Sequence, residues 1–393
     1  MEGSLSDRAI SVAFHGMRTF CKFLSANDTG ETGGHQAGIY IAKPAISILF
    51  EKPFQRGENG ERWVRATWND EFTTDTRFIY YGQKTRNEYR ITNFGKGFPY
   101  LKPQYTGALF VLTQVSEDDY RGYFLNTEDD IQNFLDAFGI SPVETNRLLK
   151  LEQTLPGQLS EQTLQKFLDD VHHTFPSGSE MAMQARLLRY KYGISKSLAV
   201  TDPDSIILDW IDCEYQLFRA LENDNYGSQI RQGFSSMDDF LELAKAVLNR
   251  RKSRAGKSLE SHLAAVFDVN HLQYTAQANT EENKRPDFIF PSEVAYHNMA
   301  FDTNLLTSLA AKTTCKDRWR QILNEADRLR DREKYLCTLQ QGISGAQMDE
   351  MQAEKVILVV PKKYIGMYPK DRQSRIWTIG KFVGYIREKE GIK

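Results

Sequence analysis

The chain has 393 residues, 40% hydrophobic and 12% aromatic, with a formal net charge of −2 at pH 7. This length predicts two or perhaps three domains that each bury a core, and the overall charge gives no sign of a nucleic-acid partner. The four cysteines include no CxxC pair, and no apolar run reaches the roughly 18–20 residues of a membrane span, which argues against a zinc site, a disulfide scaffold and a membrane partner.

β-Formers and turn signals dominate the first part of the chain. We expect a helix at the start, another over 129–138, and short strands at 39–41, 45–50, 78–81 and 108–112. Glycine-bearing stretches separate the expected strands, as in a barrel-like β domain. The pattern therefore predicts a mostly-β N-terminal domain over residues 1–150.

The sequence becomes polar after about residue 141 and contains Pro156-Gly157. We therefore expect a linker over 151–168 and a second domain over 169–393. Helices are expected at about 180–192, 204–222, 236–250 and 257–267. Further on, strands are expected at 287–290, 306–313 and 356–360, with a long helix over 317–332. This order predicts an α/β domain with a mixed sheet.

Three residues of the second domain suggest hydrolysis of a phosphodiester. Asp287 opens an expected strand, Lys312 lies on the next, and Glu325 lies on the helix that follows. Such chemistry needs acids to hold a divalent cation and a positive charge near the attacking water. Taken singly, an aspartate, lysine or glutamate is more often a member of a surface ion pair, and only the combined spacing favours a site.

Residues 250–257 carry five cations and no acid. A local basic stripe can bind phosphates without a basic pI, which makes Arg250, Arg251, Lys252 and Arg254 candidate phosphate ligands. The alternative is a solvated loop.

Residues 286–327 resemble the active-site region of the PD-(D/E)xK nucleases, in the EcoRII-like branch. Pro286-Asp287 is the literal PD, but Ala310 stands where the general pattern has its second acid, and Glu325 fits the downstream acid of this branch. The likeness continues through 249–260, 175–180 and 24–36. It implies that Asp287 and Glu325 hold Mg²⁺, that Lys312 orients the attacking water, and that Glu260 stands in or near the second shell.

The resemblance also implies how DNA is recognised. Lys316, Asp317 and Arg318 match a triplet that reads adjacent C:G pairs, and cations can bond guanine while aspartate accepts from cytosine. On a helix over 317–332, Arg318 and Glu325 would share a face, so that one reads bases while the other turns to the metal. A charged first helical turn would explain Asp317 alone.

EcoRII-like enzymes recognise CCWGG and flip the central bases, which then need stacking partners. Tyr215 matches a stacking position, and Trp210 is the candidate for the second face, because the arginine of the family is missing one turn earlier. Ordinary helix packing is the alternative role for Tyr215.

The N-terminal domain resembles an effector domain with a B3-like pseudobarrel fold. Matches to its DNA-contacting positions are His35, Tyr40, Lys84, Arg86, Glu88 and Arg90, whereas Tyr89 replaces a basic residue. Loss of that cation should weaken effector binding or shift its preference. A charged strand edge that blocks aggregation is the alternative.

Together these features predict a Mg²⁺-dependent type II restriction endonuclease of a prokaryotic cytoplasm. We expect a homodimer through the C-terminal domain, autoinhibition relieved by a second DNA site, and a cognate cytosine methyltransferase as functional partner. The alternatives are a DNA-binding regulator that has lost cleavage and a nuclease of altered specificity.

Overall fold

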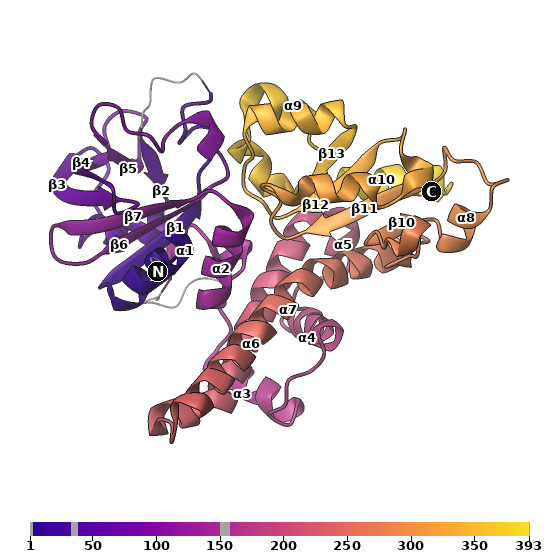
Figure 1. Cartoon of the computed structure of the whole chain (residues 1–393), viewed down its shortest axis with the longest axis horizontal. Helices are drawn as coiled ribbons and strands as arrows, with labels where there is room; N and C mark the ends of the chain where they lie inside the picture. The colour runs from indigo at the N-terminus through magenta and orange to yellow at the C-terminus, as the bar shows by residue number, and fades with distance from the viewer. Residues whose placement is uncertain (1–2, 33–37, 150–157, 393) are drawn as a thin grey trace.

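The computed structural model describes residues 3–32, 38–149 and 158–392. A β-rich N-terminal part stands beside an α/β C-terminal part, and two long helices project away from both (Figure 1). None of the described helices combines the length and apolar character that a membrane span requires.

One eight-stranded sheet forms the N-terminal part, in the order β2-β5-β4-β3-β7-β6-β1-β8. Its strands are β1 (Arg18–Phe23), β2 (Ile39–Ile41), β3 (Asn59–Trp68), β4 (Phe72–Tyr81), β5 (Glu88–Thr92), β6 (Leu109–Gln114), β7 (Asp119–Leu125) and β8 (Arg147–Leu148). Neighbouring strands are antiparallel, except for the parallel pair β3 and β7. The sheet curls into a half-barrel, which confirms the predicted barrel-like β fold.

Alternate residues of these strands fill two cores, because successive side chains point to opposite faces of a sheet. Phe20 and Phe110 belong to the core inside the curl, whereas Cys21 and Val111 pack under two helices on the outer face. These helices are α1 (Leu5–His15) and α2 (Glu128–Phe138). Helix α2 thereby stands at the boundary with the C-terminal part (Figure 1).

The strand predicted over 45–50 is wrong. Residues Lys43–Ile48 form a 3-10 helix with Pro44 in its first turn. Ala45, Ile48 and Leu49 are buried at helical spacing, so the apolar run that suggested a strand packs as a turn of helix.

A five-stranded sheet in the order β13-β12-β11-β10-β9 forms the C-terminal core. The strands are β9 (Thr275–Ala276), β10 (Phe288–Phe290), β11 (Thr307–Lys312), β12 (Lys334–Thr338) and β13 (Val356–Val359). Strands β9, β10 and β11 pair antiparallel, whereas β11, β12 and β13 pair parallel. The predicted mixed sheet is confirmed, although β9 and β12 were missed.

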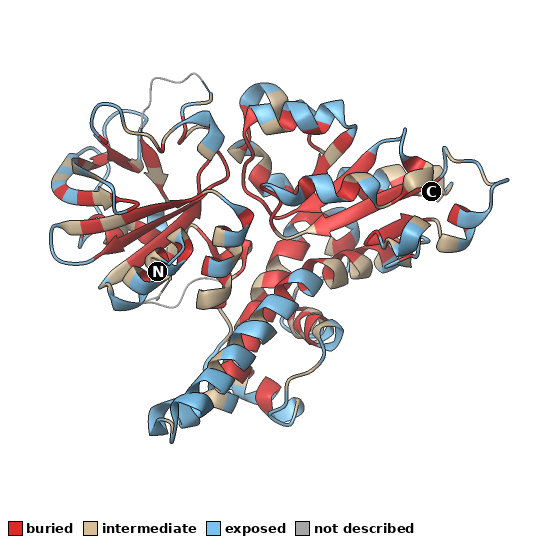
Figure 2. Cartoon of the chain, viewed as in Figure 1, coloured by how far each residue is buried: buried red, intermediate tan, exposed pale blue. Residues whose placement is uncertain are grey.

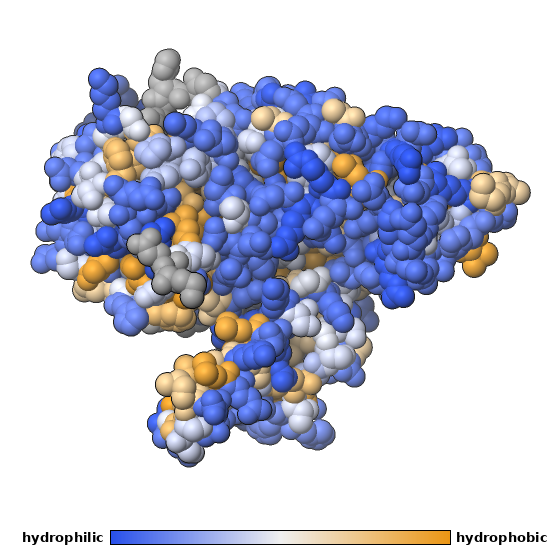
Figure 3. Space-filling view, in the orientation of Figure 1, coloured by the Kyte–Doolittle hydropathy of each residue, from blue (hydrophilic) through white to orange (hydrophobic). Residues whose placement is uncertain are grey.

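Eight helices accompany this sheet in the described part of the chain. They are α3 (Glu161–Asp170), α4 (Gly178–Lys191), α5 (Leu198–Thr201), α6 (Pro203–Gln232), α7 (Met237–Val269), α8 (Glu293–His297), α9 (Gly345–Ala353) and α10 (Ile379–Lys389). Near the sheet α6 and α7 are buried, and their far ends are exposed (Figure 2). Apolar side chains appear on the surface of this projection (Figure 3). Met237 and Leu241 of α7 are among the exposed hydrophobic residues.

Helix α7 corrects the prediction of two shorter helices at 236–250 and 257–267. It continues through Gly256, where an added Cβ would meet no neighbour within 4 Å. A single glycine costs a helix only about 1 kcal/mol. Burial of Arg254, Ser258 and Leu259 on both sides of it keeps the helix intact.

The long helix predicted over 317–332 is also wrong. The segment consists of two 3-10 turns, Arg318–Asn324 and Asp327–Leu329. The carboxylate of Glu281 accepts hydrogen bonds from the backbone N–H groups of Asp327 and Arg328. These donors are therefore not available to an α-helical ladder, and Arg318 and Glu325 do not share a helix face.

Part of the predicted linker at 151–168 is ordered helix. Residues 150–157 lie outside the described residues, but α3 begins at Glu161. Its Phe167 and Leu168 are buried in a cluster with Leu217 of α6. Helix α3 therefore packs with the C-terminal part, whereas β8 pairs with β1 of the N-terminal sheet. The proposed domain boundaries remain a prediction.

Candidate active site

Asp287 and Lys312 lie close together where two neighbouring strands of the C-terminal sheet begin and end. Asp287 directly precedes β10, and Lys312 is the last residue of the neighbouring strand β11. The backbone N–H of Ala311 donates to Asp287 Oδ2 over 2.7 Å, and Lys312 Nζ lies 3.6 Å from the same oxygen. The antiparallel pairing of two short strands thus brings together the acid and the cation that the sequence predicted.

Glu260 reaches this place from helix α7. Its carboxylate accepts a hydrogen bond from Gln277 Nε2 at 3.0 Å, and the same amide nitrogen donates to Asp287 Oδ1 at 2.9 Å. Gln277 follows β9 and was not predicted, because a lone glutamine in a turn carries no signal in a single sequence. The structure therefore adds a fifth side chain to the four predicted ones and joins two of them.

Glu325 approaches from the end of the first 3-10 turn. Thr280 Oγ1 donates to its backbone carbonyl at 2.6 Å and ties this turn to the segment before β10. Burial raises the pKa of Glu325 to about 7, with the charge of Asp287 adding to the rise and Lys312 opposing it. Burial, followed by Asp287, likewise raises the pKa of Glu260 to about 7. Both acids therefore lie within electrostatic reach of Asp287.

These acids fit a hard divalent cation. Among the described residues no three histidine, cysteine or acidic side chains form a ready-made metal cluster. Mg²⁺, however, is usually held by one or two carboxylates together with water and substrate phosphates. Burial is the main cause of the raised pKa values of Glu260 and Glu325, and the charge of Asp287 adds to it, so a bound cation would favour the ionised form of both acids. The donor set of Asp287, Glu325 and Glu260 is oxygen throughout, as Mg²⁺ prefers.

Lys316, predicted to read bases, is buried against the N-terminal part. Its Nζ donates to the carbonyl oxygens of Gln104 at 3.2 Å and Thr106 at 2.5 Å. Burial lowers the pKa of Lys316 to about 8. A buried ammonium held by two carbonyls is not available to a guanine in this arrangement.

The rest of the triplet also contacts the N-terminal part, at the start of α2. The Glu128 carboxylate accepts from the backbone N–H groups of Asp317 and Arg318, at 3.4 and 3.1 Å. Asp317 Oδ2 accepts from the Glu128 N–H in return, and the Arg318 guanidinium pairs with Asp129. We call these contacts of Glu128 and Asp129, with those of Lys316, the latch.

The predicted phosphate ligands of α7 have mostly protein partners. Arg250 stacks on Phe175, with 3.9 Å from its guanidinium carbon to the ring centroid. Arg251 pairs with Glu222 and donates to two carbonyls at the end of α2. Arg254 is buried and pairs with Glu214 at 2.7 Å. Of the four, only Lys252 is exposed, so only its side chain is directly open to DNA.

Neither predicted stacking residue lies on the surface. Trp210 is fully buried in the C-terminal core, with its ring 5.6 Å from that of His262. Tyr215 is 5% exposed and lies under the Arg254 guanidinium, 3.8 Å from the ring centroid. The structure thus gives Trp210 a packing role, because a base could stack on it only after the core repacked.

The effector-binding candidates gather around β5 at the edge of the N-terminal sheet. Tyr40 of β2 pairs across from Arg90 of β5, and Glu88 pairs with Arg90 at 3.2 Å. Arg86 stacks on Tyr81, Lys84 is exposed, and His35 lies outside the described residues. The Tyr89 ring is buried and stacks on Tyr80 with centroids 4.5 Å apart.

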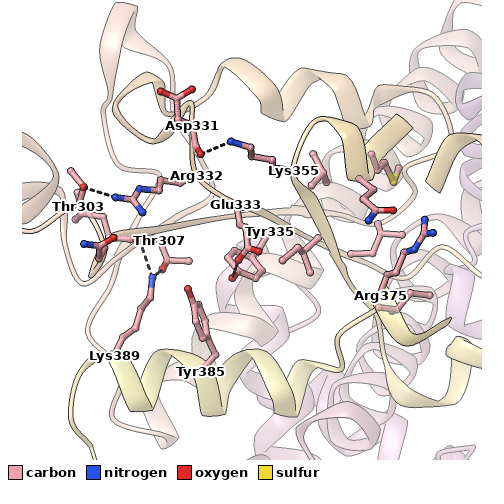
Figure 4. A pocket seen from close by; sticks show the side chains of 18 of the residues that line it. Thr303, Thr307, Asp331, Arg332, Glu333, Tyr335, Lys355, Arg375, Tyr385 and Lys389 are labelled. Atoms are coloured by element: carbon pink, nitrogen blue, oxygen red, sulfur yellow. Dashed lines mark hydrogen bonds between the residues drawn. The ribbon is translucent and has the colours of Figure 1, made fainter. Parts of the chain in front are cut away.

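A cavity in the described part of the chain lies away from these residues. It has a volume of about 680 Å³ and lies at the starts of β12 and β13, opposite the end of β11 that carries Lys312. Arg332, Lys355, Tyr385 and Lys389 point toward it (Figure 4). None of the predicted site residues lines this cavity, so it is separate from the hydrolytic centre.

Comparison with known proteins gives matches over nearly the whole chain. Residues 218–383 match the family model of the EcoRII C-terminal domain, and residues 13–135 match that of the N-terminal domain of restriction endonuclease EcoRII. The type II restriction enzyme EcoRII of Escherichia coli is 39% identical over 396 residues, covering 96% of each chain. The type II restriction enzyme SsoII of Shigella sonnei is 29% identical over 126 residues, covering 30% of this chain and 40% of that enzyme. A solved structure of metal-depleted Ecl18kI with uncleaved, modified DNA matches at a TM-score of 0.47 and 18% identity, covering 59% of this chain and 85% of the other.

Proposed function

The chain belongs to the EcoRII family of type II restriction endonucleases, and from this premise we propose that it cleaves CCWGG-like sites with Mg²⁺ under the control of its N-terminal domain. The observation that carries the hydrolytic part is the Asp287–Lys312 pair at β10 and β11, with Glu260 and Glu325 beside it. An intact set of acids and lysine favours a nuclease over a DNA-binding regulator that has lost cleavage.

In this proposal Asp287, Glu325 and Glu260 hold the cation through carboxylate oxygens. When bound, Mg²⁺ supplies positive charge that stabilises the charge developing on the scissile phosphate. The hydrogen bond from Ala311 fixes the Asp287 carboxylate. Lys312, whose side chain is 30% exposed, keeps its ammonium at the mouth of the site, where it orients the attacking water and offsets negative charge on the phosphate.

Recognition is assigned to Lys316, Asp317 and Arg318, and the latch supports control by the N-terminal domain. The same side chains that would bond C:G pairs are held by α2 and by the carbonyls of Gln104 and Thr106. DNA and the N-terminal domain would then compete for one surface. A second DNA site bound by the N-terminal domain activates the enzyme if it binds better to the open arrangement than to the closed one.

A protein that cuts both strands needs two hydrolytic centres, and each chain supplies one set of these residues. We therefore propose a homodimer through the C-terminal domain, accompanied in a prokaryotic cytoplasm by a cognate cytosine methyltransferase. Tyr215 is kept as a stacking candidate for a flipped base once Arg254 moves, whereas Trp210 is not.

Digestion of phage DNA with Mg²⁺, followed by sequencing of the fragment ends, tests the activity and its specificity together. Ends at CCWGG are expected. Cleavage at another sequence would favour a nuclease of altered specificity, and specific binding without cleavage would favour the regulator. Sedimentation of the protein in solution tests the dimer.

A further inference from the structure

The side-chain amide of Gln277 lies between two of the acids at the hydrolytic centre. An amide nitrogen carries two N–H donors, and here one goes to Glu260 Oε2 at 3.0 Å and the other to Asp287 Oδ1 at 2.9 Å. The amide therefore satisfies one oxygen of each carboxylate and keeps two like charges side by side.

The backbone of Gln277 is fixed by the strands that place Asp287. Its N–H donates to the carbonyl of Asp287 at 3.0 Å, and the preceding residue, Ala276, pairs with Phe288. Gln277 has a φ of +50°, in the left-handed region that few residues other than glycine adopt. A strained backbone held by these contacts indicates a side chain whose direction is set by the fold.

Glu260 depends on this amide more than Asp287 does. Asp287 also accepts from the Ala311 N–H and lies 3.6 Å from Lys312 Nζ. Within the described part of the chain, the hydrogen bond from Gln277 is the one that ties the Glu260 carboxylate to the site. Without it, repulsion from Asp287 would let the Glu260 side chain turn away.

We propose that Gln277 is a positioning residue: its amide holds Glu260 beside Asp287, so that both carboxylates are already gathered when a divalent cation binds. This inference rests on the proposed role of these acids as cation ligands. Residues that orient metal ligands typically change metal affinity by 10–100-fold when they are replaced. Preorganisation lowers the cost of binding, so the main effect falls on affinity for the cation rather than on the step that follows.

The test measures the affinity of the full-length protein for Mn²⁺ without DNA, with electron paramagnetic resonance reporting the concentration of the free ion. Gln277→Ala should lower Mn²⁺ affinity about 10–100-fold. Gln277→Gly also removes the amide and suits the positive φ, so it reports the same loss without added backbone strain. Gln273→Ala is the matched control: the described hydrogen bonds of Gln273 use its backbone N–H, not its side chain.

Cleavage gives a second readout. The Gln277 variants should need more Mg²⁺ for half-maximal rate and approach the wild-type rate when Mg²⁺ is saturating. Asp287→Asn distinguishes a failure of the proposed cation site from a failure of the positioning role of Gln277. If Asp287→Asn leaves Mn²⁺ binding intact, the proposed cation site is wrong; if it removes binding while both Gln277 variants bind as the wild type does, only the positioning role is wrong.

Discussion

Replacement of Glu128 should open the latch and raise cleavage of DNA that carries a single site. The Glu128 carboxylate is 7% exposed and receives two backbone hydrogen bonds, from Asp317 and Arg318. Hydrogen bonds to charged groups contribute about 1.5–3 kcal/mol each. Burial raises the pKa of Glu128, so desolvation of the carboxylate outweighs the hydrogen bonds that favour its charge. Glu128→Ala leaves the N–H groups of Asp317 and Arg318 without their acceptor in the closed arrangement. A donor left without a partner costs about 1–3 kcal/mol, so we take about 2 kcal/mol for the loss of the carboxylate.

About 2 kcal/mol corresponds to roughly a 30-fold shift of the closed-to-open ratio. The effect of Glu128 on its own helix, where an acid is favourable near the N-terminus, is present in both arrangements and cancels. The rate at which Glu128→Ala cleaves single-site DNA should rise by up to about this factor. It should not exceed the rate of the isolated catalytic part, which has no latch to open. Asp129→Ala removes only an exposed ion pair, worth about 0–1 kcal/mol, and should raise the rate a few-fold at most.

The assay follows a supercoiled plasmid with one site, with and without short duplexes that carry CCWGG. Duplex should stimulate the wild type strongly and Glu128→Ala weakly, since the variant is already open. Glu128→Gln keeps the size and one acceptor oxygen, so its rate should fall between the two. Single-site rates that are equal for the wild type and Glu128→Ala, with equal stimulation by duplex, would refute the latch.

Four further outcomes are expected. Lys312→Ala should lower Mg²⁺-dependent cleavage by at least about 100-fold and keep specific binding in a gel-shift assay, and a variant that still cuts at the wild-type rate contradicts the role of Lys312. In the protein opened by duplex, Arg318→Ala should lose about 1–3 kcal/mol of discrimination at one guanine. Lys252→Ala should instead weaken binding of cognate and non-cognate DNA alike and reduce the salt dependence of the affinity. Equal losses of affinity for both kinds of DNA in both variants would show that Arg318 does not read bases. A fragment that begins at residue 158, which retains all of α3, should cut single-site DNA without stimulation by duplex, and a fragment as slow as the full chain would argue against gating. Burial lowers the pKa of Lys316 to about 8 in the closed arrangement, whereas an exposed lysine has a pKa near 10.4, so the closed form gains stability as pH rises from about 8 toward 10. The ratio of the full-length rate to the fragment rate should therefore fall between about pH 8 and 9.5, and a constant ratio would contradict this.

The meeting of Asp287 and Lys312 could be predicted because local sequence determines the strands beside them. Asp287 and Lys312 flank short apolar runs whose strand character is plain, and pairing of the two runs brings the residues together. The turn that carries Glu325 was mispredicted because Trp319, Ile322, Ala326 and Leu329 are spaced for burial in either an α-helix or 3-10 turns. The choice depends on Glu281, which caps the second turn from more than 40 residues away.

The latch could not be read from the sequence for a similar reason. A basic-acidic-basic triplet looks like an exposed reader of bases, and nothing near Lys316 shows that it is buried. Its partners, the carbonyls of Gln104 and Thr106, are more than 200 residues away. Likewise Arg251 and Arg254 look like phosphate ligands until their buried partners, Glu222 and Glu214 of α6, are seen. Charge is visible in a sequence, whereas its neutralisation by distant residues is not.

If Lys316, Asp317 and Arg318 read bases as proposed, their use as closing contacts limits how strong the latch can be. An effector duplex at about 100 times its dissociation constant, bound only to the open arrangement, supplies about 2.7 kcal/mol. This is close to the roughly 2 kcal/mol assigned to the Glu128 contacts. A latch several times stronger would therefore stay shut at reachable DNA concentrations, and a much weaker one would leave the base-reading residues free without effector. The buried ammonium of Lys316 fits this balance, because its depressed pKa means that closure carries a cost at neutral pH which weakens the latch. The proposed control by a second DNA site thus requires a closed arrangement that is only marginally more stable than the open one.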